Sequence, residues 1–263
     1  MHGRRADSVA MMPDAGDLGG DLAAALAGRA EGLQLALQPI CAAATLAPVG
    51  YEALLRWEHP EFGAIPPMTT LAAADAVGRS IALDAWAVVA AFRLRAAWPA
   101  GGPYLAVNLS AAGIRSGHVA PMIRAALDTT GADPRGLLLE MPEATVGADI
   151  PAARAAAAAL RGFGIAVALD DFGGSHGSAR ILRDIAFAAV KIDPALTEGI
   201  EEAGPDGDRA RAMLSAVVDM AHAMGATVIA EAVESVGQMR ALREAGCDAL
   251  QGWLLGRPNL EMT

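Results

Sequence analysis

Residues 164–174 read GIAVALDDFGG, so an apolar run stops at two adjacent carboxylates, Asp170 and Asp171. A short apolar run bounded by glycines is typical of a buried strand. Two neighbouring anions at the end of such a strand repel each other unless a cation or a proton lies between them. Asp and Gly also favour turns, so the pair alone indicates a turn as readily as a site. The residues at the ends of the other apolar runs decide between a turn and a functional site.

Eight short apolar runs alternate with longer amphipathic stretches. The runs are residues 33–39, 50–57, 104–109, 137–141, 165–170, 188–192, 227–231 and 248–253. Helical patterns lie between most of them, at residues 68–77, 83–98, 118–130, 151–163, 178–183, 208–224 and 236–245. This alternation predicts an α/β fold, a (β/α)8 barrel in one domain over residues 32–263. A doubly wound open sheet is the alternative, but neither GxGxxG nor GxxxxGK[ST] occurs.

Composition limits the class of protein. The formal net charge of −10 over 263 residues disfavours binding to a DNA or RNA duplex. The two cysteines form no CxxC pair, so neither a disulfide framework nor a thiolate zinc site is expected. Residues 1–31 are rich in Gly, Ala and Asp, and we expect a flexible or weakly helical lead-in there. No signal peptide and no membrane span of ~20 apolar residues is recognisable, so we expect a cytoplasmic protein.

Polar side chains gather at the C-terminal ends of the apolar runs, which form the active-site face of a barrel. They are Glu52, Asn108, Glu140, Asp170, Asp171, Lys191, Glu231, Glu234 and Gln251. Oxygen ligands select Mg²⁺, Mn²⁺ or Ca²⁺, and the lack of a His or Cys cluster argues against zinc. The pattern therefore predicts a site for hard divalent cations. A shared carboxylate such as Asp170 would allow the two-metal arrangement used in phosphodiester cleavage.

Eight short motifs also occur in the order in which one protein family carries them. They are QPI (38–40), EAL within GYEALLRWEHP (50–60), VNLS (107–110), the pair Glu140 and Glu143, ALDDFG (168–173), KID (191–193), AEAVE (230–234) and QGWLLGRP (251–258). From about residue 33 to 258 the chain resembles the EAL domains, the cyclic-di-GMP phosphodiesterases of bacteria. The resemblance implies a modified TIM-like barrel with an antiparallel first strand, and hydrolysis of cyclic di-GMP to linear pGpG.

The resemblance also implies a ligand set for two Mg²⁺ or Mn²⁺ ions, with Ca²⁺ as an inhibitor. One ion would be held by Glu52, Asn108, Glu140 and Asp170. Asp170 would bridge to a second ion that Asp171 also contacts. Lys191 would position or polarise the attacking water, and Glu231 would be a general base or a metal ligand.

Further roles follow from the same resemblance. Glu234 and Gln251 would hold waters around the ions, and Glu143 would anchor the loop after Asp171. The substrate groove would be lined by Gln38, Leu54 and Arg56, with Arg56 on a phosphate. A homodimer and a sensor or regulatory domain elsewhere in the protein are also expected from the family.

One loop departs from the family pattern. The family's DDFGTGYSS is DDFGGSHGS at residues 170–178, with Gly174, Ser175 and His176 in place of Thr, Gly and an aromatic residue. A glycine-rich loop loses more entropy when it orders, so the placement of Asp171 is affected. Three readings stay open: a slower or partner-dependent phosphodiesterase, a module that binds cyclic di-GMP or a protein without efficient turnover, and a barrel enzyme with another substrate.

We expect the triple change Gly174→Thr, Ser175→Gly and His176→Tyr to raise the turnover of cyclic di-GMP several-fold, because the family loop would order Asp171 beforehand. Turnover and metal dependence are measured beside the unchanged chain. Equal values for both would show that the loop does not limit the reaction.

Overall fold

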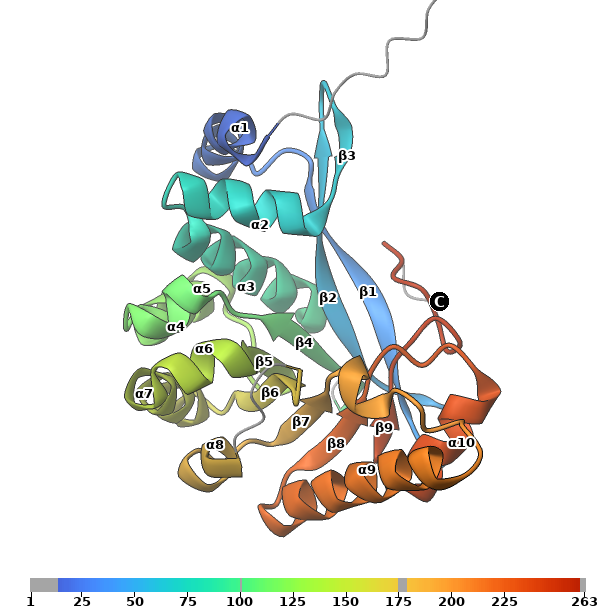
Figure 1. The fold of residues 1–263 in the computed structure, drawn as a ribbon. Coiled ribbons are helices and arrows are strands. Elements are labelled where there is room, and N and C mark those ends of the chain that lie inside the picture. The colour runs from blue at the N-terminus through green and yellow to red at the C-terminus, as the bar shows by residue number, and fades with distance from the viewer. Residues whose placement is uncertain (1–13, 100, 175–178, 261–263) are drawn as a thin grey trace, which may run out of the picture.

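The strands close into a ring in the computed structural model, which describes residues 14–99, 101–174 and 179–260. The sheet order is β1-β9-β8-β7-β6-β5-β4-β2-β3, and β1 also pairs with β2. Eight of these strands therefore form a closed barrel within the described residues, and helices surround it (Figure 1). The α/β barrel expected from the alternation is confirmed, and the open sheet is wrong.

Each barrel strand falls on one of the eight predicted runs. The strands are β1 (Leu33–Ala42), β2 (Pro48–His59), β4 (Tyr104–Asn108), β5 (Leu137–Pro142), β6 (Ala166–Phe172), β7 (Ala189–Ile192), β8 (Thr227–Ala230) and β9 (Ala249–Leu250). Strand β1 runs antiparallel to both β2 and β9, whereas the other pairs of barrel strands, from β2–β4 to β8–β9, are parallel. The antiparallel first strand implied by the resemblance is thus confirmed.

The helices follow the predicted amphipathic stretches with four additions. They are α1 (Ala15–Ala27), α2 (Pro67–Ala76), α3 (Ser80–Ala96), α4 (Ala111–Arg115), α5 (Val119–Thr130), α6 (Glu143–Ala148), α7 (Ile150–Gly162), α8 (Ala179–Asp184), α9 (Pro205–Ala223), α10 (Val236–Glu244) and the 3₁₀ helix η1 (Pro194–Thr197). Helices α4, α6 and η1 and the hairpin strand β3 (Gly63–Ile65) are too short to give a periodic pattern. No described helix combines the length and the apolar character that crossing a membrane requires.

The two faces of the barrel strands carry different residues, because strand side chains alternate. The outward residues pack with the helices in the main core, which includes Leu105, Leu139 and Val190. The inward residues form a smaller apolar cluster of Ile40, Ala106, Leu138, Ala168, Ala189, Ile229 and Ala249. Each member of this inner cluster is two residues from a polar residue of the predicted site. The alternation therefore stacks the polar layer directly on an apolar layer inside the barrel.

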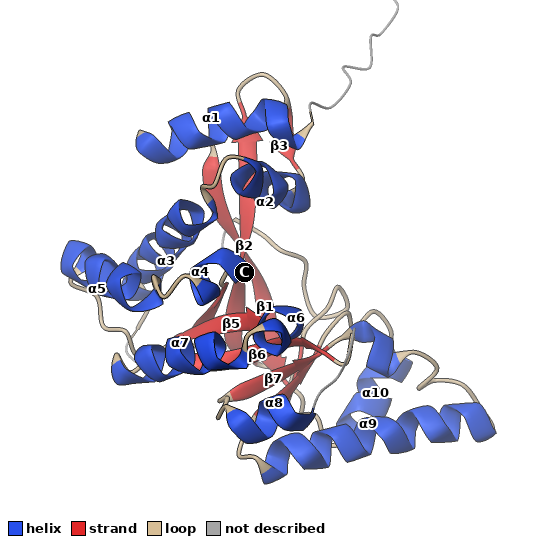
Figure 2. Cartoon of the chain, turned by 60° about the vertical axis from the view of Figure 1, so that its left-hand side comes forward, coloured by secondary structure: helices blue, strands red, loops and turns tan. Residues whose placement is uncertain are grey.

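Helix α1 differs from the expectation for residues 1–31. Its first turn is capped by Asp14, whose carboxylate accepts a hydrogen bond from the Asp17 N–H at 2.9 Å. Leu18 and Leu22 are completely buried in a cluster with residues of β1, β2, β3, α2 and α3, such as Trp57. Figure 2 shows α1 and α2 packed beside the arm where β2 and β3 extend beyond the barrel. Residues 15–27 are thus a packed helix, and the domain boundary at residue 32 stays a prediction.

Asp84 on α3 links this helix to the end of β4. Its side chain is buried, and its carboxylate accepts hydrogen bonds from the Ser110 N–H at 3.1 Å and the Ser110 hydroxyl at 2.7 Å. The same hydroxyl accepts a bond from the Gly113 N–H at 3.0 Å and so caps α4. Burial raises the pKa of Asp84 to about 6, although the bonds from Ser110 act to lower it. The neutral form of Asp84 is therefore favoured by folding.

We expect this carboxyl group to make folding stability fall as the pH rises. Its folded pKa of about 6 lies above the ordinary value of 3.8, so its contribution is complete below pH 3.8 and is lost as the pH passes through 6. The difference corresponds to roughly 3 kcal/mol. Asp84→Asn lacks this titration. Its free energy of unfolding, relative to that of the unchanged chain, should therefore rise between pH 4 and pH 7 by up to this amount. Urea unfolding at both pH values measures it, and a constant difference would contradict the expectation.

Candidate functional site

Lys191 on β7 lies at the centre of the polar layer, with a side chain only 1% exposed. Its Nζ lies 3.2 Å from Glu52 Oε2, 3.1 Å from Glu140 Oε2, 3.1 Å from Asp170 Oδ1 and 2.8 Å from Glu231 Oε1. These carboxylates come from β2, β5, β6 and the residue after β8. One ammonium group is therefore shared by four carboxylates that the barrel brings together from distant parts of the chain.

Two amide side chains hold Glu52 in place, and a third supports one of them. Its Oε1 accepts a hydrogen bond from Asn108 Nδ2 at 2.8 Å, and its Oε2 accepts one from Gln251 Nε2 at 2.7 Å. Gln251 Nε2 also donates to Gln38 Oε1 at 3.2 Å, and Gln38 Nε2 donates to the Gly256 carbonyl at 3.2 Å. Because Asn108 and Gln251 bond to different oxygens, the Glu52 carboxylate has a single orientation.

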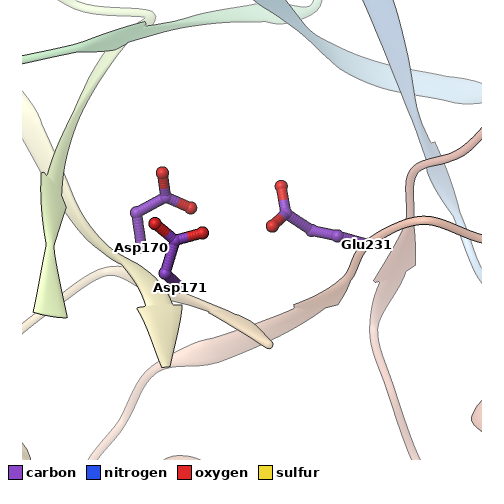
Figure 3. Close-up of side chains that lie close together, drawn as sticks. All are labelled: Asp170, Asp171 and Glu231. Atoms are coloured by element: carbon purple, nitrogen blue, oxygen red, sulfur yellow. The ribbon is translucent and has the colours of Figure 1, made fainter. Parts of the chain in front are cut away.

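Asp170 and Asp171 serve the same site because β6 bulges between them. Adjacent side chains of a regular strand point to opposite faces. The register with β7 shifts between Leu169 and Phe172, where β6 has one residue more, and Asp171 takes the left-handed φ of 57°. A bulge of this kind re-aims a side chain. One carboxylate oxygen each of Asp170, Asp171 and Glu231 lie within 4.8 Å of one another, and Figure 3 shows the three carboxylates converging.

The loop after β8 aims Glu231 at the cluster. Ala232 has a left-handed φ of 51°, which costs a residue other than glycine about 1 kcal/mol. The Glu234 N–H donates to Gln238 Oε1 at 2.8 Å, the same oxygen that accepts from the Ser235 N–H in the capping box of α10. Glu234 itself is exposed, and it is not among the four carboxylates around Lys191. Of the two glutamates of the AEAVE motif, Glu231 therefore points into the cluster and Glu234 does not.

Burial and crowding change the pKa values in the cluster. Burial, with repulsion from Glu52, raises the pKa of Glu140 well above its ordinary value. Burial also raises the pKa of Glu231 to about 7 against the attraction of Lys191, and it raises that of Asp171. Burial acts to raise the pKa of Glu52 too, but Lys191 and the amide bonds prevail and lower it. The carboxylates together raise the pKa of Lys191 despite its burial.

This donor set fits divalent cations. Glu140 Oε1 is buried without a hydrogen-bond partner in the described residues, and Asp170 Oδ1 has only its ion-pair contact with Lys191. Buried polar atoms are rarely left in this state. Together with Asp171 and Glu231, they offer carboxylate oxygens of the kind that Mg²⁺, Mn²⁺ and Ca²⁺ prefer. One ammonium does not neutralise the cluster, so further cations or protons are required.

A groove of ≈ 620 Å³ adjoins the carboxylates. It is lined by Asp170 and Asp171 at the site, by Leu54 of β2, and by Met68 and Leu71 of α2, among others. Its volume lies in the range of small-ligand sites. The groove thus places apolar side chains directly beside the charged cluster.

The structure also places the remaining predicted residues. Glu143 Oε2 accepts a hydrogen bond from the Gly173 N–H at 3.0 Å, directly after the bulge. Arg56 is half-buried and lines a neighbouring groove between β1, β2 and β3. It makes no ion pair with the carboxylates around Lys191, but its charge interacts with that of Glu52. Ser175 and His176 lie outside the described residues. Gly174 lies against Asp193, whose Oδ2 would be 2.4 Å from an added Cβ, so a threonine there requires Asp193 to move.

Sequence reasoning missed the part of the site that α2 and α3 supply. Met68, Leu71 and Asp84 all line the groove beside the carboxylates. Asp84 had a recognisable signal, because it is a single charged residue in the apolar stretch 81–92. The α2 residues had none, since an apolar residue on a helix indicates a core position equally well.

Comparisons with known proteins agree with this geometry. The chain is 35% identical over 213 residues to the bifunctional diguanylate cyclase/cyclic di-GMP phosphodiesterase MucR of Pseudomonas aeruginosa, covering 80% of this chain and 30% of MucR. A solved structure of the PaMucR phosphodiesterase in complex with c-di-GMP superposes with a TM-score of 0.82 at 32% identity, over 92% of this chain and 97% of that one. The calcium/cy-diGMP complex of Klebsiella pneumoniae BlrP1 gives 0.76 at 28% identity, over 96% and 59%.

This chain thus spans less than a third of the length of MucR. The family pattern described as the EAL domain matches residues 20–258, which include every residue of the acidic cluster and of the groove named above. The chain belongs to the EAL domain family.

Proposed function

We propose that this chain is a metal-dependent phosphodiesterase that hydrolyses cyclic di-GMP to linear pGpG. The observation that carries the proposal is the layer around Lys191, where four carboxylates share one ammonium and two buried carboxylate oxygens lack hydrogen bonds. The adjoining groove offers apolar walls for a guanine base. The relationship to MucR, whose name includes cyclic di-GMP phosphodiesterase, supports the choice of substrate.

Two groups of ligands would hold Mg²⁺ or Mn²⁺. Glu52, Asn108, Glu140 and Asp170 would bind one ion, and Asp170 with Asp171 and Glu231 would bind the second. Bound there, such ions stabilise the negative charge that develops on the attacking and leaving oxygens of a phosphodiester. Ca²⁺ would occupy the same oxygens but would inhibit, because it accepts looser geometry and longer ligand distances.

The side chains of this chain would supply the remaining steps. Where Glu231 does not ligate the second ion, it would accept a proton from the attacking water. In the cluster without ions, burial raises its pKa to about 7. Lys191 would hold the four carboxylates in their positions and polarise the water. The groove beside Leu54 would receive one base, while Arg56 on the neighbouring arm would contact a phosphate. Gln251, which already holds Glu52, and Glu234 would order waters at the rim.

A module that binds cyclic di-GMP without efficient turnover is the second candidate. The observation that favours it is the changed loop, in which Gly174 lies against Asp193 at the position of the family's threonine. We also propose a cytoplasmic homodimer that acts with a sensor or regulatory domain.

The direct test incubates the protein with cyclic di-GMP and Mg²⁺ or Mn²⁺ and looks for pGpG. We expect product with either ion, inhibition by Ca²⁺, and a loss of at least about 100-fold in turnover for Glu52→Ala, as expected when a group that stabilises the transition state is removed. Glu58→Ala, on the exposed arm of the same strand, is the matched control and should retain turnover. Binding without product in both metals would favour the receptor module.

We expect Lys191→Met to make folding depend on divalent cations. Losing the ammonium leaves buried carboxylates without a counter-charge, which costs roughly 3–5 kcal/mol. Mg²⁺ or Mn²⁺ should restore more of the melting temperature in this variant than in the unchanged chain, because the ions replace the lost charge. Arg115→Met, at an exposed position on α4, is the control. Equal metal-induced shifts in all three proteins would show that no cation site overlaps the cluster.

A further inference from the structure

Helix α1 packs directly against helix α2. A Cβ added to Gly19 of α1 would be 2.4 Å from Val77 Cγ1 and 3.3 Å from the Ala73 carbonyl oxygen, so glycine allows the two backbones to approach. Leu18 and Leu22 on the same helix are completely buried. Gly20, the next residue, has open space around it. The contact is therefore specific to one face of α1.

A buried histidine ties α1 to the hairpin of β2 and β3. His59 Nδ1 accepts hydrogen bonds from the N–H groups of Glu61 at 3.1 Å and Phe62 at 3.3 Å, so this nitrogen carries no proton. The proton is therefore on Nε2, which donates to Asp21 Oδ2 of α1 at 3.2 Å. The ring also stacks on Phe62, with 4.9 Å between centroids, and meets Trp57 edge-on. The hairpin thus holds α1 through a bond of fixed direction.

Helix α2 stands between α1 and the groove of the site. It begins two residues after β3, so the hairpin that carries His59 leads directly into it. Its residues Ala73 and Ala74 are buried in one cluster with Leu18 and Leu22 of α1. Met68 and Leu71, together with Ala74, line the groove that also contains Asp170 and Asp171. If α1 moved away, α2 would lose the packing on one of its sides. The other side of α2 forms a wall of the groove.

We propose that α1 is a positioning element for ligand binding: the Asp21–His59 bond and the Gly19 contact hold α2 in place, and α2 sets the shape of the groove. Detaching α1 loosens α2 and weakens the binding of cyclic di-GMP, while the carboxylates around Lys191 stay in place. The binding half of this proposal rests on the proposed function. The half that concerns α1 and α2 does not.

Two matched pairs of variants test it. Gly19→Leu forces α1 away from α2, whereas Gly20→Leu adds the same side chain where space is open. Asp21→Ala removes the acceptor of the histidine bond, whereas Asp17→Ala removes another exposed carboxylate of α1. Asp21→Asn retains an acceptor oxygen and should rescue the behaviour of the unchanged chain. Circular dichroism and thermal melting check that each variant is folded.

Hydrogen exchange of the α2 amides without ligand is the first measurement. We expect about tenfold faster exchange in Gly19→Leu and Asp21→Ala, with no change in the two controls or in Asp21→Asn. The second is the Kd of cyclic di-GMP in Ca²⁺, by calorimetry, which does not depend on turnover. We expect it to rise about fivefold or more in the same two variants.

Each result bears on a distinct claim. Unchanged exchange in α2 would overturn the coupling of α1 to α2, whatever the ligand. Faster exchange with an unchanged Kd would overturn the coupling of α2 to binding. An unchanged chain that binds no cyclic di-GMP would refute the proposed function, and the exchange data would still decide whether α1 positions α2.

Discussion

One ammonium group shared by four buried carboxylates is the interaction on which the centre of this barrel depends. Lys191 contacts side chains from β2, β5, β6 and the end of β8, so it joins strands on different sides of the ring. The desolvation of such charges is costly, and their mutual attraction offsets it only when the geometry is well satisfied. The hydrogen bonds from the amides of Asn108 and Gln251 to Glu52 offset part of this desolvation cost. Glu140 Oε1 is left without a hydrogen bond, and this oxygen is where the site is open to a further cation.

The alternation of strand residues explains why so much of this centre could be predicted from the sequence. Once the eight runs are placed, Glu140, Asp170 and Lys191 fall on the same face as Leu138, Ala168 and Ala189, two residues earlier on each strand. The direction of β1 could not be obtained in this way, because an alternating pattern reads the same in both directions. It followed only from the resemblance to a family. For residues 1–31 the sequence indicated only a flexible or weakly helical lead-in. The packing of α1 was missed because its many Ala and Gly residues mask the two leucines that pack.

The bulge in β6 shows where alternation fails as a guide. Strict alternation places Asp171 on the outer face, among the helices, yet its carboxylate lies with those of Asp170 and Glu231. The extra residue and the left-handed backbone at Asp171 are local exceptions that depend on the pairing with β7. Ala232 is a second exception of the same kind, at the residue after Glu231. Strained backbone at two positions next to functional side chains is the usual cost of aiming them.

The charge of the site constrains the order of events if a cyclic dinucleotide is the ligand, as we propose. Five carboxylates and one ammonium make the layer strongly negative unless protons or metal ions are bound, and an anionic ligand is repelled from it. The raised pKa values of Glu140 and Glu231 mean that protons already neutralise part of this charge when cations are absent. Metal ions would displace these protons and favour the anion, and the anion would favour the ions by the same free energy. On this proposal, the binding of ligand and metal to this chain would be coupled through the carboxylates that Lys191 holds together.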